Sequence, residues 1–236
     1  MKNITLRELL EAGCHFGHRV DRWNPKAKEF IYGEKNGIHI INLEKTLSQL
    51  IIAVEFLRKA ALSGKTIVFV ATKKQAKPIL MDLVEKHKLN FVVDRWPGGF
   101  LTNFDMVAKS FVKMRQLEEL IQTASTTKSR TKKEILLAEK ELKKLNRIYG
   151  GVRELKSIPD ILVVVDTKKE EKIVREAERT GVEIVGLVDT NASPYDVAHY
   201  IPTNDDAAHA IACILTPLAE AVEEGRGERE KTINKE

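Results

Sequence analysis

The chain has 236 residues, 43% of them hydrophobic and 31% charged, which is typical of a folded globular protein and argues against a disordered one. Its longest apolar runs are far shorter than the ~18 to 20 residues of a membrane-spanning helix, which argues against a membrane protein. Two cysteines, Cys14 and Cys213, are too few for a disulfide framework, and the start lacks the apolar core of a signal peptide, so we expect an intracellular protein.

Charge is distributed unevenly along the chain, although the net charge is only +5. Residues 1–104 contain 17 Lys and Arg against 10 Asp and Glu, and residues 105–150 contain 11 against 6, whereas residues 151–236 contain 11 against 18. The basic first two-thirds indicate a surface that binds a polyanion. The acidic last third indicates a surface that faces solvent or binds a basic or neutral partner. Solvated surface charge without any partner is the simpler alternative.

The first 62 residues contain three signals of local structure. Thr5 and Glu8 have the spacing of a capping box, which predicts a helix at the start of the chain. Asn36 and Gly37 stand between two short β-prone runs and predict a β-hairpin. Apolar residues then recur at helical spacing over residues 43–62.

Apolar runs of strand length then alternate with amphipathic segments. The predicted strands cover residues 66–72, 90–94, 160–166 and 182–189. The predicted helices that follow them cover residues 75–87, 170–180 and 205–223. This alternation is typical of an α/β fold, and we predict a doubly wound parallel sheet with a flavodoxin-like strand order and helices on both faces.

The region between the second and third predicted strands is too long for a single crossover helix. Residues 105–122 and 131–149 both show helical periodicity, and apolar residues in the second recur three and four apart in a heptad pattern. We therefore predict an inserted antiparallel α-helical coiled-coil hairpin. The chain would divide into three parts. Residues 1–104 and 151–224 would form an α/β domain, residues 105–150 this hairpin, and residues 225–236 a disordered tail.

Basic side chains gather in places that suit a phosphate backbone. In HFGHRVDRWNPKAK, residues 15–28, a tryptophan that could stack on a base or ribose lies among them, although packing in a turn explains it equally well. In ATKKQAK, residues 71–77, lysines follow a strand at the sheet edge where open α/β folds bind ligands. The predicted RNA-binding residues are Arg19, Arg22, Trp23, Lys26, Lys28, Lys73, Lys74, Lys77, Arg95, Asn103, Lys109, Lys113, Arg130, Lys132 and Lys133.

The segment RWPGGFLTNF, residues 95–104, resembles a nucleotide-binding loop at first sight. Its two glycines, Gly98 and Gly99, lack the G-x-G-x-x-G spacing of a dinucleotide fingerprint. We interpret them as a turn into the hairpin, with Thr102 as the cap of the helix and the neighbouring basic residues near a phosphate.

Catalytic and metal sites are weakly supported. Cys14 and the two nearby histidines, His15 and His18, have no second C-x-x-C or H-x₃-H element that would complete a zinc site. A variant in which His18 meets Asp189 or Asp205 from the distant sheet edge is the remaining metal alternative. We expect no catalytic residue, no metal and no cofactor.

An enzyme is the alternative function. Asp166 and Asp189 follow two predicted strands and could serve a nucleotide- or metal-dependent α/β enzyme, but aspartates in such places commonly cap the next helix. The sequence contains no phosphate-loop lysine or G-x-S-x-G motif to accompany them. A third alternative is an adaptor whose acidic last third recruits a protein.

Several motifs together resemble the S-two family of small-subunit ribosomal proteins, of bacterial or organellar type. They are LLEAGCHFGHRVDRWNPKAKEFIYGEKNGIHIINLEKT, FVATKKQA, DRWPGGFLTNF, PDILVVVD, VDTNASP and IPTNDDAAHAI, in this order. The resemblance implies a flavodoxin-like domain with an inserted coiled-coil hairpin and a non-enzymatic role in the cytoplasmic or an organellar ribosome. It implies binding to small-subunit rRNA between head and body and to neighbouring ribosomal proteins, including help in docking protein S-one. We expect no homo-oligomer.

Overall fold

A five-stranded parallel sheet forms the centre of the computed structural model, which describes residues 4–127 and 131–233. Its strands, in spatial order, are β5 (Asn90–Val92), β4 (Ile67–Val70), β6 (Ile161–Val165), β7 (Glu183–Val188) and β8 (His199–Pro202). Every neighbouring pair is parallel. Numbered along the chain, this order is 2-1-3-4-5, so the flavodoxin-like prediction is confirmed. The last strand, β8, lies in a segment for which the sequence predicted no strand.

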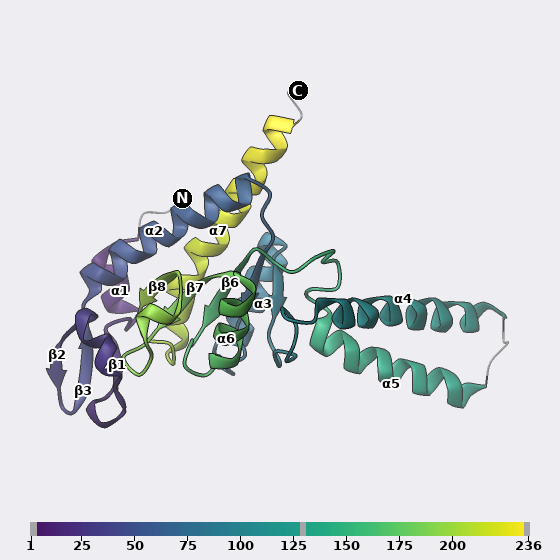
Figure 1. The fold of residues 1–236 in the computed structure, drawn as a ribbon, viewed down its shortest axis with the longest axis horizontal. Coiled ribbons are helices and arrows are strands. Elements are labelled where there is room, and N and C mark those ends of the chain that lie inside the picture. Colours follow the sequence, from purple (N-terminus) through teal and green to yellow (C-terminus); the bar gives the residue numbers. More distant parts are fainter. Residues whose placement is uncertain (1–3, 128–130, 234–236) are drawn as a thin grey trace.

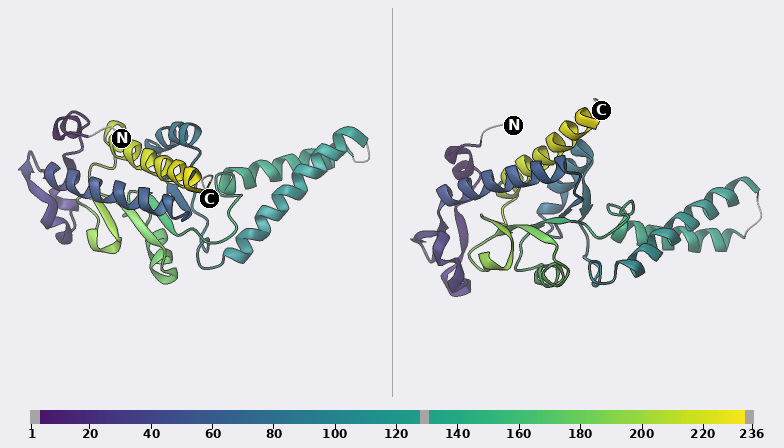
Figure 2. Two further views of the ribbon diagram at one scale, coloured as in Figure 1. Left: turned by 90° about the horizontal axis from the view of Figure 1, so that it is seen from above. Right: turned by 45° about the horizontal axis from the view of Figure 1, so that its top comes forward.

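Helices cover both faces of this sheet (Figures 1 and 2). One face packs on α2 (Leu43–Leu62), α3 (Ala76–His87) and α7 (Ala208–Ile233), and the other packs on α6 (Glu171–Thr180) and the start of α4 (Phe104–Thr127). Residues of each strand alternate between the two cores, because successive side chains in a strand point to opposite faces. Both faces are therefore buried, which explains the continuous apolar runs.

A second, three-stranded antiparallel sheet is built by the N-terminal segment. Helix α1 (Leu6–Glu11) precedes strand β1 (Phe16–Arg19), two short 3-10 helices, η1 (Val20–Arg22) and η2 (Pro25–Phe30), and strands β2 (Ile31–Lys35) and β3 (Ile38–Ile41). The order is β1-β3-β2. Asn36 and Gly37 have φ angles of 54° and 74°, as a tight hairpin turn requires, so the predicted hairpin is confirmed. Strand β1 was not predicted.

Two long helices, α4 and α5 (Lys132–Tyr149), project side by side from the core (Figure 1). A series of aromatic contacts fixes their base. It runs from Trp96 through Phe100, Phe104 and Phe111 to Tyr149, with ring centroids 4.8–6.1 Å apart. The inserted helical pair was predicted, whereas its heptad packing stays a prediction.

Several predicted helix boundaries were wrong. Helix α4 begins at Phe104, so Asn103 rather than Thr102 immediately precedes it. Helix α7 continues to Ile233, although the sequence predicted a disordered tail from residue 225. The extension is held by contacts with α2, where Nη1 of Arg58 donates to Oε2 of Glu228 at 2.9 Å. Residues 234–236 lie outside the described part of the chain.

The 3-10 helix η3 (Pro194–Asp196) completes the elements between β7 and β8. Among the helices of residues 4–127 and 131–233, none is both long and apolar enough to span a membrane.

Candidate nucleic-acid interface

The basic N-terminal segment is largely open to solvent. Arg22, Lys26 and Lys28 are exposed. Arg19 is exposed too, and its guanidinium pairs with Asp21 at 3.1 Å. Exposed ion pairs of this kind are worth little, so Arg19 can exchange Asp21 for a phosphate at small cost.

Trp23 is half-buried, and its ring centroid lies 5.3 Å from that of His39 on β3. The packing role that the sequence offered for this tryptophan is therefore observed. Stacking on RNA stays a prediction.

Three of the predicted contacts at the edge of the parallel sheet face solvent at least in part. Lys74 and Arg95 are exposed. Lys77 is half-buried, and its ammonium pairs with Asp94 at 2.5 Å, which lowers the pKa of that carboxyl. Arg147 of α5 also reaches Asp94, at 3.3 Å, and joins the hairpin to the sheet edge.

Lys73 differs from its neighbours because its side chain is only 11% exposed. Its Nζ lies 2.8 Å from Oδ2 of Asp166, 2.6 Å from Oδ1 of Asp205 and 2.7 Å from Oδ1 of Asp206. Burial alone would lower the pKa of Lys73, but the carboxylates outweigh burial and raise it, led by Asp205. The three protons of the ammonium thus have partners within the chain, and contact of Lys73 with RNA stays a prediction.

The glycine turn also holds an internal anion. The carboxylate of Glu176 on α6 accepts hydrogen bonds from the backbone N–H groups of Gly99 and Leu101, at 2.8 and 3.2 Å. Backbone amides of this kind are what a phosphate would need. Glu176 occupies these amides. The groups near the turn that remain open to RNA are therefore the exposed side chains of Arg95 and Asn103 beside it.

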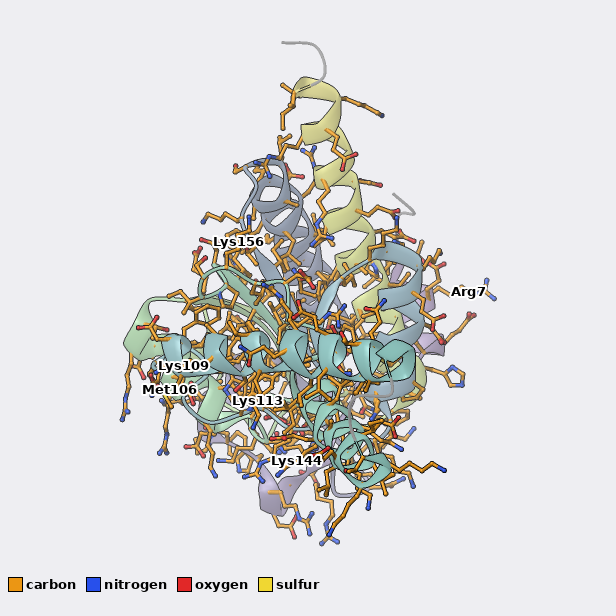
Figure 3. All side chains as sticks on the ribbon, turned by 90° about the vertical axis from the view of Figure 1, so that its right-hand side faces the viewer. Arg7, Met106, Lys109, Lys113, Lys144 and Lys156 are labelled. Atoms are coloured by element: carbon orange, nitrogen blue, oxygen red, sulfur yellow. The ribbon has the colours of Figure 1, made fainter. Side chains whose placement is uncertain are left out.

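The predicted residues of the hairpin lie on its outer surface. Lys109 and Lys113 of α4 are exposed, as are Lys132 and Lys133 in the first turn of α5. Figure 3 shows the hairpin end of the molecule, with Lys109 and Lys113 labelled along α4. Lys113 forms an exposed ion pair with a glutamate of α5, Glu141. Arg130 lies outside the described residues.

The structure does not bring all these residues into one patch. The N-terminal sheet lies at one end of an elongated molecule and α4 with α5 at the other, with α3 between them (Figure 1). The interface would therefore be extended.

The sequence prediction missed further exposed basic residues of α5. Their outward positions in the heptad pattern of this helix could have indicated them. They are Lys140, Lys143, Lys144 and Arg147.

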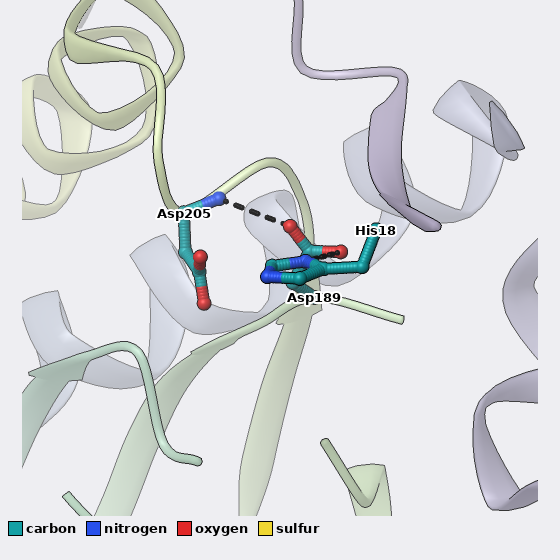
Figure 4. A group of neighbouring side chains, drawn as sticks. All are labelled: His18, Asp189 and Asp205. Carbon is teal, nitrogen blue, oxygen red and sulfur yellow. Dashed lines mark hydrogen bonds and ion pairs between the residues drawn. The ribbon is translucent and has the colours of Figure 1, made fainter. Parts of the chain in front are cut away.

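A buried polar cluster lies at the carboxyl edge of the sheet (Figure 4). His18 from β1 reaches it because Gly17 lets the strand approach the loop after β7, where an added Cβ would lie 2.6 Å from Cγ2 of Thr190. Nδ1 of His18 is 3.0 Å from Oδ1 of Asp189, a hydrogen bond that raises the pKa of His18. Burial raises the pKa of Asp205 to about 7, and the nearby aspartates add to this effect.

The two strand-end aspartates have structural partners rather than an evident catalytic one. Oδ1 of Asp166 accepts from the backbone N–H of Lys169 at 2.8 Å, and Oδ1 of Asp189 accepts from that of Thr190 at 2.5 Å. These are local bonds to the backbone of the loops after β6 and β7, although neither aspartate caps a helix, because the residue that precedes α6 is Glu170.

Lys73 pairs with three aspartates at the ligand edge of this α/β sheet, and the projecting elements carry exposed basic side chains, a combination that suits a structural protein of nucleic-acid assemblies. A comparison with known families gives the assignment. The model of the family described as ribosomal protein S2 matches residues 9–225, and the chain belongs to this family. The assignment confirms that the protein is a non-enzymatic one that acts in translation.

Individual relatives match along almost the whole chain. The small ribosomal subunit protein uS2 of Coprothermobacter proteolyticus is 45% identical over 236 residues, which cover 100% of this chain and 88% of that protein. The protein of the same name from Geotalea uraniireducens is 44% identical, covering 95% of this chain and 88% of its own. That of Dictyoglomus turgidum is 44% identical, with coverage of 98% and 94%.

Proposed function

We propose that this chain is a structural component of the small subunit of the bacterial-type, cytoplasmic ribosome and binds small-subunit rRNA between head and body. The family match over residues 9–225 carries the proposal. Exposed lysines and arginines on the N-terminal segment, the sheet edge and the hairpin support it. Such side chains bind phosphates by releasing counterions, and their spread along the molecule suits an extended RNA surface.

The binding of purified small-subunit rRNA at several salt concentrations tests the rRNA contact. We expect log K to fall linearly with log salt concentration, by about 0.7–0.9 for each phosphate contacted. The double variant Lys132→Ala, Lys133→Ala should bind more weakly and reduce this slope. Lys156→Ala, in the connection between α5 and β6, serves as a control because that residue is exposed and outside the predicted set. Binding without salt dependence would contradict the proposal.

We also propose that the N-terminal end helps to dock protein S-one. Apolar side chains are exposed there, including Leu10 at 53% and Tyr32 at 79%. They line a hollow of about 430 Å³ between α1 and the antiparallel sheet. Exposed apolar surface of this kind is typical of protein contacts.

Co-sedimentation of S-one with reconstituted small subunits tests the docking role. Leu10→Glu should reduce the S-one that is recovered while the chain itself stays on the subunit. Ile51→Glu is the matched control, since Ile51 is similarly exposed, at 59%, on the distinct surface of α2. Equal recovery of S-one with the wild type, Leu10→Glu and Ile51→Glu would reject this role.

A further inference from the structure

The carboxyl edge of the parallel sheet contains more buried negative charge than its lysine offsets. Asp166, Asp189 and Asp205 are 6%, 1% and 1% exposed. Lys73 supplies one positive charge to this group. Burying a charge without a counter-charge is strongly unfavourable, so the cluster needs further neutralisation, either by protons on its own groups or by a bound cation.

Three side chains of the cluster converge in a way that suits a metal ion (Figure 4). His18, Asp189 and Asp205 each offer one ligand atom, and these atoms lie within 4.8 Å of one another. The 3.0 Å between Nδ1 of His18 and Oδ1 of Asp189 is close to the separation of two ligands about 2 Å from a shared tetrahedral ion.

An unsatisfied oxygen gives independent support. Oδ2 of Asp205 is buried and accepts no hydrogen bond from the described residues, while Oδ1 of the same group is held by Lys73 at 2.6 Å. Buried carboxylate oxygens normally have a partner. The lysine thus fixes the carboxylate and leaves its second oxygen available as a ligand.

The surroundings of the ligands resemble those of protein metal sites, in which a ligating histidine donates its other N–H and a ligating carboxylate is itself hydrogen-bonded. Nε2 of His18 lies 3.1 Å from the side-chain amide of Asn191 and 3.6 Å from Oδ2 of Asp206; turning that amide by 180° would bring its unpaired Oδ1 to Nε2 as the acceptor of this N–H. Oδ1 of Asp189 accepts from both the backbone N–H and the hydroxyl of Thr190. These contacts would orient the imidazole and one carboxylate toward a shared ion.

We propose that His18, Asp189 and Asp205 bind one Zn²⁺ ion, with water as the fourth ligand, and that the ion fastens the N-terminal sheet to the α/β core. The imidazole favours zinc over magnesium, which prefers oxygen ligands and retains its waters. His18 belongs to β1, whereas the two aspartates follow β7 and β8, so the ion joins two parts of the fold. The loops after these strands supply the ligands that the local sequence around His18 lacks.

Titration of the chelator-stripped full-length protein with ZnCl₂, followed by calorimetry, tests the proposal. We expect one Zn²⁺ per chain and no comparable binding of MgCl₂. Asp205→Asn keeps the size of the side chain and an oxygen for Lys73 but removes the anionic ligand, and it should weaken zinc binding by at least about 10-fold. His18→Ala should do the same. His209→Ala is the control, because His209 is an exposed histidine outside the cluster and its loss should leave the affinity unchanged.

Limited proteolysis provides a second readout. A plain His18–Asp189 ion pair would not make the rate of cleavage depend on zinc. Zinc should slow cleavage within the first 42 residues of the wild-type protein and of His209→Ala, but not of Asp205→Asn. Circular dichroism would verify that each variant is folded, and Asp205→Asn decides the question if His18→Ala does not fold. Absence of stoichiometric zinc binding, or equal affinity in wild type and Asp205→Asn, would overturn the proposal.

Discussion

Replacement of Lys73 by methionine removes the positive charge from the buried cluster while retaining most of the volume of the side chain. Asp166 and Asp205 would lose their ammonium partner in a site where both are almost inaccessible to water. Asp206 contributes less, because its side chain is 56% exposed. Breaking a buried pair by removing one partner typically costs about 3–5 kcal/mol, and we expect a loss of this size in the free energy of unfolding.

Urea denaturation of metal-free protein, followed by circular dichroism, measures this loss. Lys74→Ala is the matched control, since Lys74 is the exposed neighbour and its replacement should change stability by no more than about 0.5 kcal/mol. Lys74→Ala should instead weaken rRNA binding. If Lys73→Met unfolds within about 1 kcal/mol of the wild type, the buried carboxylates do not depend on the ammonium and the reasoning is refuted.

Three further substitutions test the fold around the proposed interface. Trp96→Ala removes the first ring of the aromatic contacts below the hairpin and should lower the free energy of unfolding by about 3–5 kcal/mol in urea; an unchanged midpoint would contradict their role. Gly17→Ala places a Cβ against Thr190 and should cost about 1–3 kcal/mol, visible as a lower melting temperature, whereas an equal melting temperature would show that the close approach is not needed. Thr131→Ala removes the capping box of α5 and should destabilise that helix by about 1 kcal/mol; hydrogen exchange of its first turn should rise, and unaltered exchange would count against the cap.

The parallel sheet could be predicted because its signals are local. Strands buried on both faces give continuous apolar runs, and the helices between them have their own periodicity. Strands β1 and β8 have no such signal. Phe16–Arg19 contains a glycine and two basic residues and becomes a strand through its pairing with β3, and His199–Pro202 is an edge strand that ends in proline.

The exposed basic residues could be predicted from composition, but the fate of Lys73 could not. In the sequence it is one of three clustered lysines, and its burial depends on Asp205 and Asp206, which lie more than 130 residues away. The extension of α7 has a similar cause. Gly225 and Gly227 suggest a break in the helix, yet packing on α2 overrides their low helix propensity.

A density map of small ribosomal subunits purified from cells that produce this chain tests the proposed role most directly. We predict density for the chain between head and body, with the N-terminal segment and the α4–α5 hairpin within hydrogen-bonding distance of rRNA phosphates. Small subunits that are complete without the chain, or a chain bound with these basic surfaces turned to solvent, would contradict it.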